Sequence, residues 1–261
     1  MNGFSATFSK DVVVKDGKLH LRDEPIERFE ITDVLGDGAN GVVLDARHRL
    51  LNQPRAVKVW MKLRDTDKRD KVRQGIEEAQ KLAASDPKWV AMVYDAEVEG
   101  GFLYSSMERI YGHTLANELK ASDNLFNRWC LAAQYIDAIQ NTTTETVHHG
   151  DAHPGNVMVI RLQDQHGSYT KTKLLDFGTS LFAGKEASES RHWRIVYKTF
   201  TQIIEPFKSK DWAMDQTIPY ATRESPVLRC AYFKDVLDGL GVEAGTIRQV
   251  YHPPSPPITE E

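Results

Sequence analysis

The sequence predicts an α+β fold with two lobes, in which a small antiparallel β-sheet lobe with one helix precedes a larger, mainly helical lobe. Up to Gly112, short β-branched or apolar runs alternate with glycine, asparagine and proline, a pattern typical of strands and turns. After Gly112, apolar residues recur at helical spacing instead. The expected domains are an N-terminal lobe at residues 1–110, a helical lobe at 111–251 and a disordered proline-rich tail at 252–261.

The elements of the first lobe follow from these runs. Strands are expected at residues 30–35, 42–47, 55–60, 92–99 and 102–107, the last two joined by a glycine turn. A helix is expected at 65–84, because apolar residues recur there at helical spacing. Those apolar residues are Val72, Ile76, Ala79 and Ala83.

The second lobe is expected to contain two long helices and a short strand pair. One helix is marked by Trp129, Ala132, Ala133, Ile136, Ile139 and Gln140. The other is marked by Trp193, Val196, Tyr197, Phe200, Ile203, Ile204 and Phe207, which we interpret as core residues. The strand pair is expected at residues 157–161 and 173–175.

Composition excludes several classes of function. The 261 residues carry a formal net charge of −4, so no basic field attracts nucleic acid or an anionic membrane. The two cysteines, Cys130 and Cys230, show no metal-ligand spacing and no disulfide framework. The N-terminus does not resemble a secretion signal, and no apolar stretch approaches the ~18 residues of a membrane span. We therefore expect a cytoplasmic protein with no nucleic-acid or membrane partner.

A glycine-rich pattern, G-x-G-x-x-G-x-V, runs from Gly36 through Gly38 and Gly41 to Val43. Because glycine has no Cβ, backbone amides can approach phosphate oxygens closely there. A dinucleotide-binding fingerprint would need a helix directly after the glycines, whereas residues 42–47 have the pattern of a strand. The motif therefore predicts a hairpin with a glycine-rich tip.

Lys58 lies within an apolar strand, and Ala56 shares its face. The small alanine leaves room for a flat base beside an ammonium group that could hold phosphate oxygens. An acid on the next helix is expected to position the lysine. We favour Glu78, which borders the apolar stripe, over Glu77, which has basic residues four positions away on both sides. The alternative is that both glutamates are solvated.

The most specific run extends from His149 to Met158 and contains Asp151 and Asn156; Asp176 follows 20 residues after Asn156. Phosphoryl transfer needs a carboxylate that orients the attacking hydroxyl and oxygen ligands that bind magnesium. Each of these residues is also common in turns. Their order along the chain nevertheless predicts this chemistry.

Together these motifs resemble the protein-kinase-like superfamily over about residues 30–215: the glycine-rich loop, Ala-x-Lys, a helix glutamate, H-x-D-x-x-x-x-N and D-F-G. The resemblance implies that ATP and Mg²⁺ are the cofactors. It implies that Lys58 pairs with Glu78 and holds the ATP phosphates, and that Asp151 is the catalytic base. Asn156 and Asp176 would bind magnesium.

The resemblance also implies a nucleotide pocket. The Glu108 carbonyl and the Ile110 amide would meet the adenine edge, and Val43, Ala56 and Met158 would sandwich the base. With the three glycines, Lys58 and Glu78, these form the expected cofactor-binding set.

The chain departs from the family at two positions of the catalytic loop. Gly150 stands where many regulated protein kinases have arginine, so we expect no activation by phosphorylation of a loop residue such as Thr179 or Ser180. His153 replaces the usual lysine and makes the loop reminiscent of antibiotic or choline phosphotransferases. Its imidazole could donate to the γ-phosphate as a catalytic group or simply order the loop.

The region after D-F-G departs as well. No Ala-Pro-Glu follows Gly178, and the segment 179–191 is short for a peptide platform. Asp211-Trp212-Ala213 only faintly resembles the buried aspartate–tryptophan helix of the family.

The favoured function is transfer of the γ-phosphoryl group of ATP to a hydroxyl by an atypical serine/threonine protein kinase. Gly150, His153 and the short segment support an alternative, a small-molecule phosphotransferase acting on an antibiotic, sugar or amino alcohol. A pseudokinase scaffold is the lesser alternative. The expected partners are ATP and either a protein substrate or a small hydroxyl-bearing acceptor.

Overall fold

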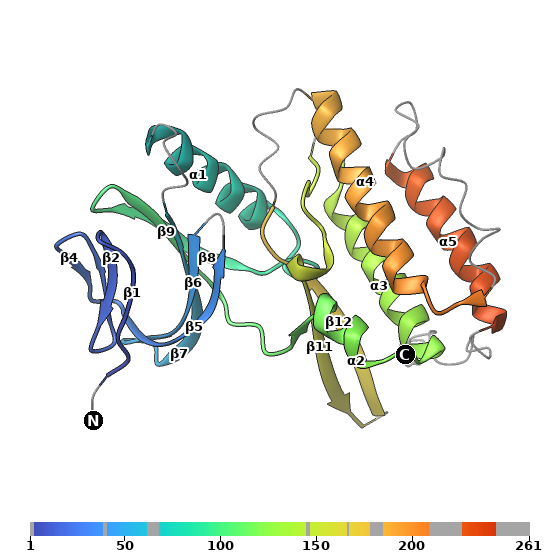
Figure 1. Cartoon of the computed structure of the whole chain (residues 1–261), viewed down its shortest axis with the longest axis horizontal. Helices are drawn as coiled ribbons and strands as arrows, with labels where there is room; N and C mark the ends of the chain where they lie inside the picture. The colour runs from blue at the N-terminus through green and yellow to red at the C-terminus, as the bar shows by residue number, and fades with distance from the viewer. Residues whose placement is uncertain are drawn as a thin grey trace, which may run out of the picture. The chain divides into compact units, whose positions relative to one another are not determined.

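The computed structural model describes residues 3–38, 41–61, 68–144, 147–165, 167–177, 185–208 and 226–243. The chain divides into two compact units (Figure 1). The first unit comprises Met1–Gly112 and Leu175–Phe182, and the second comprises His113–Leu174 and Ala183–Glu261. The segment Leu175–Phe182, which carries Asp176, thus belongs to the first unit, whereas the expected boundaries assign it to the helical lobe. The functional division at residues 110 and 252 stays a prediction.

The first unit is built on a five-stranded antiparallel sheet with the order β5-β6-β7-β9-β8. All five strands were predicted at these places, and the prediction is confirmed. Their bounds are β5 Phe29–Gly38, β6 Gly41–His48, β7 Gln53–Trp60, β8 Val93–Glu99 and β9 Phe102–Glu108. Gly100 and Gly101, with φ of 54° and 79°, form the turn between β8 and β9.

A second, four-stranded sheet precedes it and was not predicted. Its strands are β1 Ala6–Ser9, β2 Val12–Lys15, β3 Lys18–Leu21 and β4 Glu24–Ile26, paired in chain order. Alternate residues of β2 and β3, such as Val14 and Leu19, are buried against Leu44 and Val57 in one core cluster. The small sheet therefore covers one face of the larger sheet (Figure 1) and leaves the opposite face to the residues of the candidate site.

Helix α1 (Lys68–Ala84) packs on this unit through a face different from the predicted one. Ile76 is 37% exposed, whereas Glu78, Ala79 and Leu82 are buried. The reason is Gly75, where a Cβ would come within 2.3 Å of Leu103 Cδ2. The glycine lets the helix lie close to the sheet, and the face that follows it, including Glu78, turns inward.

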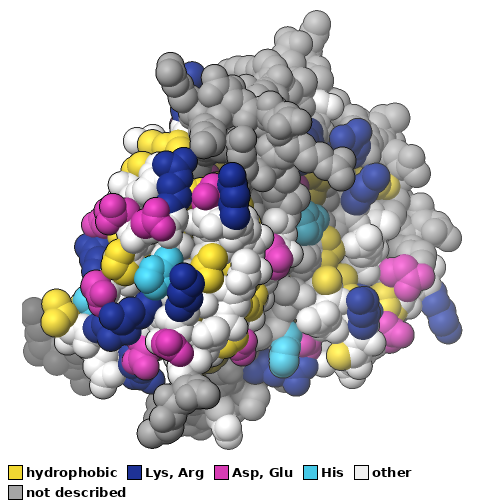
Figure 2. Space-filling model, turned by 60° about the vertical axis from the view of Figure 1, so that its left-hand side comes forward, with side chains coloured by type: hydrophobic (Ala, Val, Ile, Leu, Met, Phe, Trp, Pro, Cys, Tyr) yellow, Lys and Arg dark blue, Asp and Glu magenta, His cyan; other side chains and the backbone are white. Residues whose placement is uncertain are grey.

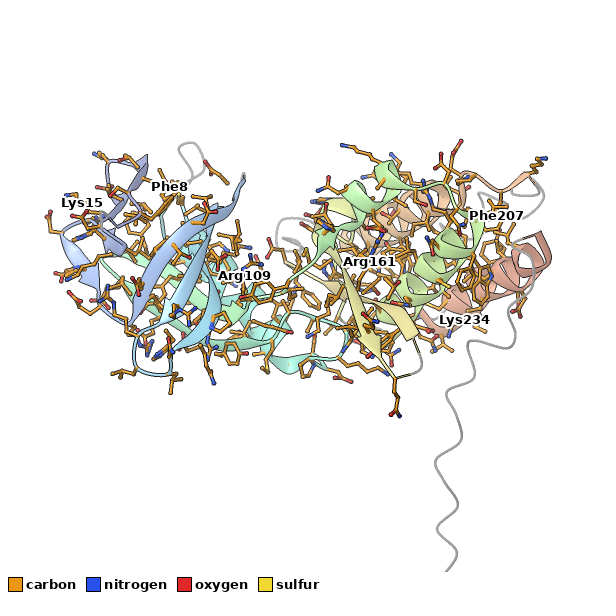
Figure 3. The ribbon with its side chains drawn as sticks, turned by 90° about the horizontal axis from the view of Figure 1, so that it is seen from below. Phe8, Lys15, Arg109, Arg161, Phe207 and Lys234 are labelled. Carbon is orange, nitrogen blue, oxygen red and sulfur yellow. The ribbon has the colours of Figure 1, made fainter. Side chains whose placement is uncertain are left out.

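The second unit contains the helices α2 Leu115–Ala121, α3 Leu125–Thr142, α4 Lys185–Ile204 and α5 Pro226–Glu243. Helix α3 packs on α4 and α5, and Figure 1 shows the three side by side. The predicted core residues of α4 are buried, as expected, whereas α5 was not predicted. On the surface, Lys234 of α5 pairs with Asp137 of α3 at 3.0 Å; Figure 3 labels Lys234.

A short three-stranded sheet, β10-β11-β12, completes the second unit. Strand β10 is His113–Thr114, and the hairpin β11 (Val157–Asp164) and β12 (Gly167–Leu174) is longer than the predicted strand pair. The one-turn 3₁₀ helix Pro154–Asn156 leads directly into β11. The hairpin therefore fixes the end of the predicted catalytic loop.

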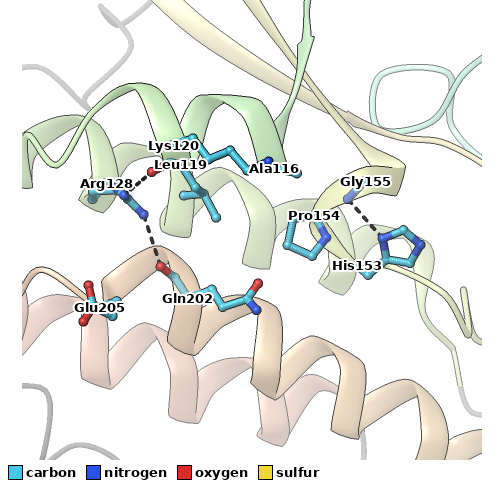
Figure 4. Close-up of a pocket in the computed structure, with 9 residues that line it drawn as sticks. All are labelled: Ala116, Leu119, Lys120, Arg128, His153, Pro154, Gly155, Gln202 and Glu205. Atoms are coloured by element: carbon cyan, nitrogen blue, oxygen red, sulfur yellow. Dashed lines mark hydrogen bonds between the residues drawn. The ribbon is translucent and has the colours of Figure 1, made fainter. Parts of the chain in front are cut away.

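The buried side chain of Arg128 connects α3 with α2 and α4. Its guanidinium donates to the carbonyls of Leu119 at 2.6 Å and Gln202 at 3.1 Å (Figure 4). It also pairs with Asp123 at 2.6 Å, while its side chain is only 5% exposed. Since the Gln202 carbonyl lies in the last turn of α4, the cation also satisfies a helix C-terminus.

The surface in Figure 2 carries Lys and Arg side chains interspersed with Asp and Glu, in keeping with the small net charge of −4. Within the part of the chain that the structure describes, no helix is both long and apolar enough to cross a bilayer.

Candidate active site

The glycine-rich motif forms the predicted hairpin in the first unit. Gly36 pairs with Val43 and Gly38 with Gly41 across β5 and β6; the two residues between Gly38 and Gly41 lie outside the described ranges. At Gly41 φ is +146°, and a Cβ would come within 2.0 Å of the Val59 carbonyl oxygen. The hairpin therefore requires glycine at position 41.

One face of the five-stranded sheet collects the predicted nucleotide-binding residues of the first unit. Val43 lies opposite Lys58, and Ala56 lies opposite Met107. Cross-strand partners project on the same side of a sheet, and alternate residues of a strand share a face. Val43, Ala56 and Lys58 therefore lie on one face. Met158, the third apolar candidate, belongs to β11 in the second unit.

Lys58 is the centre of a buried ionic cluster. Its Nζ lies 2.7 Å from Glu78 Oε1 and 3.0 Å from Asp176 Oδ1, and its side chain is 2% exposed. Glu77, the alternative partner, pairs with Arg73 at 3.1 Å. The structure thus joins Lys58, Glu78 and Asp176, which are separated by up to 118 positions in the sequence.

Burial and charge act against each other in this cluster. Burial alone would lower the pKa of Lys58, but the carboxylates of Asp176 and Glu78 outweigh it and raise that pKa, so the ammonium is charged. Burial raises the pKa of Glu78 to about 7 although Lys58 opposes the shift. The Lys58 ammonium also lies 4.8 Å from the Trp60 ring centroid, a cation–π contact.

The two residues predicted to meet the adenine edge, Glu108 and Ile110, lie at the end of β9 and just after it. The Glu108 amide donates to the Met92 carbonyl at 2.8 Å, which fixes the end of β9. Arg109, labelled in Figure 3, pairs with Asp45 at 3.0 Å and donates to the Ile110 carbonyl at 2.7 Å. Ile110 is buried. Contact of Glu108 and Ile110 with an adenine stays a prediction.

In the second unit, the backbone of the predicted catalytic loop is held by two buried hydroxyl groups. Tyr135 of α3 donates to the Ala152 carbonyl at 2.8 Å, and Thr199 of α4 donates to the same oxygen at 3.2 Å. Ala152 itself is fully buried. Two helices therefore fix the loop immediately after Asp151.

Gly150 is held from α4. Its φ is +74°, in the left-handed region that favours glycine, and its amide donates to His192 Nδ1 at 3.2 Å. The other ring nitrogen of His192 lies 3.2 Å from Thr143 Oγ1. Since Nδ1 accepts a hydrogen bond, His192 is neutral with its proton on Nε2. The glycine at this position thus has a conformational reason.

The Asp151 carboxylate faces two donors. Asn156 Nδ2 donates to Oδ2 at 3.2 Å and to the Asp151 carbonyl at 3.1 Å, and Arg191 of α4 donates to Oδ1 at 3.3 Å. His153 Nε2 lies 3.8 Å from Oδ2. The structure therefore brings Asp151, Asn156 and His153 together, and it adds Arg191.

His153 orders the loop. Its Nδ1 accepts from the Gly155 amide at 3.0 Å and so caps the 3₁₀ helix Pro154–Asn156. One of the two roles expected for His153 is thus visible in the structure. Donation to a phosphate stays a prediction.

His192 makes the stability of this loop sensitive to pH. Burial lowers the pKa of His192 well below 6.5, and His148, His149 and Arg229 add to the effect. The contribution of neutral His192 to the free energy of unfolding is fully present above about pH 6.5. It is lost as the pH falls below that value, because His192 binds a proton at a higher pH in the unfolded state than in the folded state. We expect His192→Asn, which keeps an acceptor for Gly150, to flatten the loss of Tm between about pH 7 and about pH 5. Equal slopes in wild type and variant would contradict this role.

An open pocket of about 580 Å³ adjoins the loop in the second unit (Figure 4). Its lining residues come from α2, α3, the loop and the end of α4: Ala116, Leu119, Lys120, Arg128, His153, Pro154, Gly155, Gln202 and Glu205. Figure 4 shows His153 and Pro154 on one side and Gln202 and Glu205 on another. Its lining includes the apolar residues Ala116, Leu119 and Pro154, and the Arg128 guanidinium in it is paired with Asp123.

Some predictions lie outside the described residues: Gly178, Thr179, Ser180 and Asp211-Trp212-Ala213. Sequence reasoning missed Tyr135, Arg191, His192 and Thr199. The role of each of these polar helix residues follows only from its partner, and each partner is a residue of the predicted catalytic loop.

Comparisons with known proteins agree with this arrangement. The model of the protein kinase domain family matches residues 29–201. Human Rho-associated protein kinase 1 is 28% identical over 179 residues, which cover 68% of this chain and 12% of that protein. Serine/threonine-protein kinase PrkC of Bacillus subtilis is 26% identical over 153 residues, 58% of this chain and 22% of that protein. The chain thus spans a small part of the length of these relatives.

Among solved structures, the kinase domain of PknI from Mycobacterium tuberculosis has the same fold. The TM-score is 0.59 at 18% identity, over 82% of this chain and 96% of that chain. With two thirds of its length matched by the family model, this chain belongs to the protein kinase domain family.

Proposed function

We propose that the chain is an ATP- and Mg²⁺-dependent serine/threonine protein kinase of atypical type. The observation that carries the proposal is the buried cluster in which Lys58 contacts both Glu78 and Asp176. Burying an ammonium group beside two carboxylates costs desolvation free energy, so such a cluster is weak evidence for stability alone. Ionisable groups with perturbed pKa values concentrate at functional sites. The similarity to serine/threonine kinases supports the direction of transfer to a hydroxyl.

The residues present fit a magnesium site. Mg²⁺ prefers one or two carboxylate or amide oxygens and completes its shell with water and phosphate. Asn156 uses its Nδ2 toward Asp151, which leaves its Oδ1 for a cation. Asp176 Oδ1 faces the Lys58 ammonium, and its backbone lies at a φ of +30°, an uncommon conformation often found at functional sites.

The chain's own residues have distinct roles in this proposal. Lys58 holds phosphate oxygens, and Glu78 fixes the ammonium. Asp151 orients the acceptor hydroxyl and takes its proton, while Asn156 and Arg191 hold the carboxylate in place. Magnesium, when bound to Asn156 and Asp176, supplies charge that offsets the phosphates. The glycine hairpin excludes water.

A protein acceptor is favoured by the surface beside His153. The pocket there is open, and among its described lining residues Glu205 is the one acid. A small cationic acceptor such as an amino alcohol would need an acidic cage. We propose ATP and a protein substrate as partners, in the cytoplasm; the free thiols of both cysteines agree with that compartment.

Transfer of label from γ-labelled ATP tests the proposal. The purified chain is incubated with Mg²⁺ and generic protein substrates, and separately with a panel of aminoglycosides, sugars and amino alcohols. We expect label on serine or threonine of protein, dependent on Mg²⁺. Label on a small acceptor alone would replace the proposal with the small-molecule alternative, and nucleotide binding without transfer would favour a scaffold.

A further inference from the structure

The solvent-facing side of α4 carries three cations in one row, Arg191, Arg194 and Lys198, which we name the basic stripe. Their spacing of i, i+3 and i+7 places them on one face of the helix. All three are exposed, whereas Trp193, Val196 and Phe200 face the core. Within the described part of the chain, Arg194 and Lys198 form no salt bridge. The whole chain has a net charge of −4, so three neighbouring cations on one helix face do not simply reflect a basic composition.

The stripe is continuous with the candidate active site. Its first member, Arg191, donates to Asp151 Oδ1 at 3.3 Å. Farther along the same helix face, Gln202 lines the pocket beside His153, as does Glu205 directly after the end of α4. A polypeptide whose hydroxyl lies at Asp151 would therefore have its neighbouring residues within reach of α4.

Among the side chains that the structure describes, the charge near the stripe is mainly positive. Glu189, the acid of the preceding turn, is bound to the buried Arg229 at 3.5 Å. Of the acids whose side chains the structure describes, those that remain near the row are Asp151 at its beginning and Glu205 beyond its end. Lys120, across the pocket from Glu205, adds another cation. Anionic groups would be attracted over the length between these two acids.

The length of the stripe matches a peptide. Seven residues of α-helix separate Arg191 from Lys198, a rise of about 10 Å. An extended chain covers that distance in about three residues at ~3.3 Å each. A short acidic segment next to the phosphoacceptor thus has the right span.

We propose that the basic stripe selects the acceptor, and that the substrates of this chain carry aspartate or glutamate within a few residues of the serine or threonine that is phosphorylated. This inference rests on the proposed kinase function. It adds the chemical class of the substrate.

Matched peptides with one serine test it. Three peptides differ only in their flanking residues, which are acidic, neutral or basic, and kcat/KM is measured for the whole chain with each. We expect the acidic peptide to be preferred over the neutral one by about tenfold, as a few exposed charge pairs would give. Arg194→Glu/Lys198→Glu should abolish this preference, and added salt should reduce it.

The control is Lys10→Glu/Lys15→Glu, which makes the same change of charge on exposed lysines of the first unit. This variant should keep the wild-type ratio of kcat/KM between the acidic and the neutral peptide. Measurement of Tm checks that both variants are folded. Equal use of all three peptides, or a retained preference in the folded Arg194→Glu/Lys198→Glu variant, overturns the inference while the kinase proposal stands. Failure to phosphorylate any peptide would instead count against the kinase proposal. Competition by a single-stranded oligonucleotide without any peptide preference would assign the stripe to nucleic acid and also overturn the inference.

Discussion

Replacement of Asp151 by asparagine is expected to lower kcat by about 10²–10⁴-fold, the usual contribution of a positioned general base. The amide cannot take the hydroxyl proton. In the wild type, Asn156 and Arg191 donate to different carboxylate oxygens of Asp151. The asparagine side chain has one acceptor oxygen, so one of these two donors loses its acceptor. ATP affinity should change little, because Asp151 acts on the acceptor. Initial rates on a peptide substrate, together with ATP titrations, measure both quantities.

Asp137→Asn is the matched control for this change. Asp137 lies in the same unit and pairs with Lys234 on the surface. Exposed pairs contribute about 0–1 kcal/mol, so this variant should retain activity and fold. Asp151→Asn with turnover within about tenfold of wild type would remove Asp151 from the role of base.

The second large effect is expected at Lys58. Lys58→Met should destabilise the protein by about 3–5 kcal/mol, because Glu78 then stays buried without its cation. Turnover should also fall strongly, since the phosphates lose their ammonium. Lys58→Met/Glu78→Gln should recover much of the stability but none of the activity. Denaturant unfolding and peptide phosphorylation separate the two effects.

The pH dependence of Lys58→Met has a definite sign. Burial already raises the pKa of Glu78 to about 7, above its ordinary value of 4.5. A carboxyl group whose pKa is raised on folding stabilises the protein at low pH. This contribution to the free energy of unfolding is lost as the pH rises through the raised pKa. Loss of the ammonium raises this pKa further, so the variant continues to lose stability above about pH 7. Its deficit against wild type should therefore be larger above pH 7 than below it; a deficit independent of pH would place Glu78 outside the cluster.

The sequence was most informative where chemistry restricts residue type. Lys58, Asp151, Asn156 and Asp176 stand in motifs whose order along the chain is itself specific. The preference for Glu78 over Glu77 came from the charges four residues away, and the structure pairs Lys58 with Glu78. Strands β5–β9 were predictable because their alternation and glycine turns are strong local signals.

Other features depend on tertiary contacts. Strands β1–β4 contain only three or four residues each, too few for a clear period. The inner face of α1 is set by Gly75, whose missing Cβ permits contact with Leu103. The spacing of apolar residues could not predict this face, because glycine does not count as an apolar residue in that pattern. His192 and Arg191 acquire a role only because α4 lies beside a loop about 40 residues earlier in the chain.

We propose that Asp176 and Asn156 both contribute ligands to the Mg²⁺ that accompanies ATP. Titration of ATP in the presence of Mg²⁺ into wild type, Asp176→Ala, Asn156→Ala and the double variant tests it most directly. We predict that each single change weakens binding and that the double variant is little worse than either, with a coupling energy of about 0.5–3 kcal/mol. Additive effects, or unchanged binding in either single variant, would contradict the proposed roles of Asp176 and Asn156 in binding Mg²⁺–ATP.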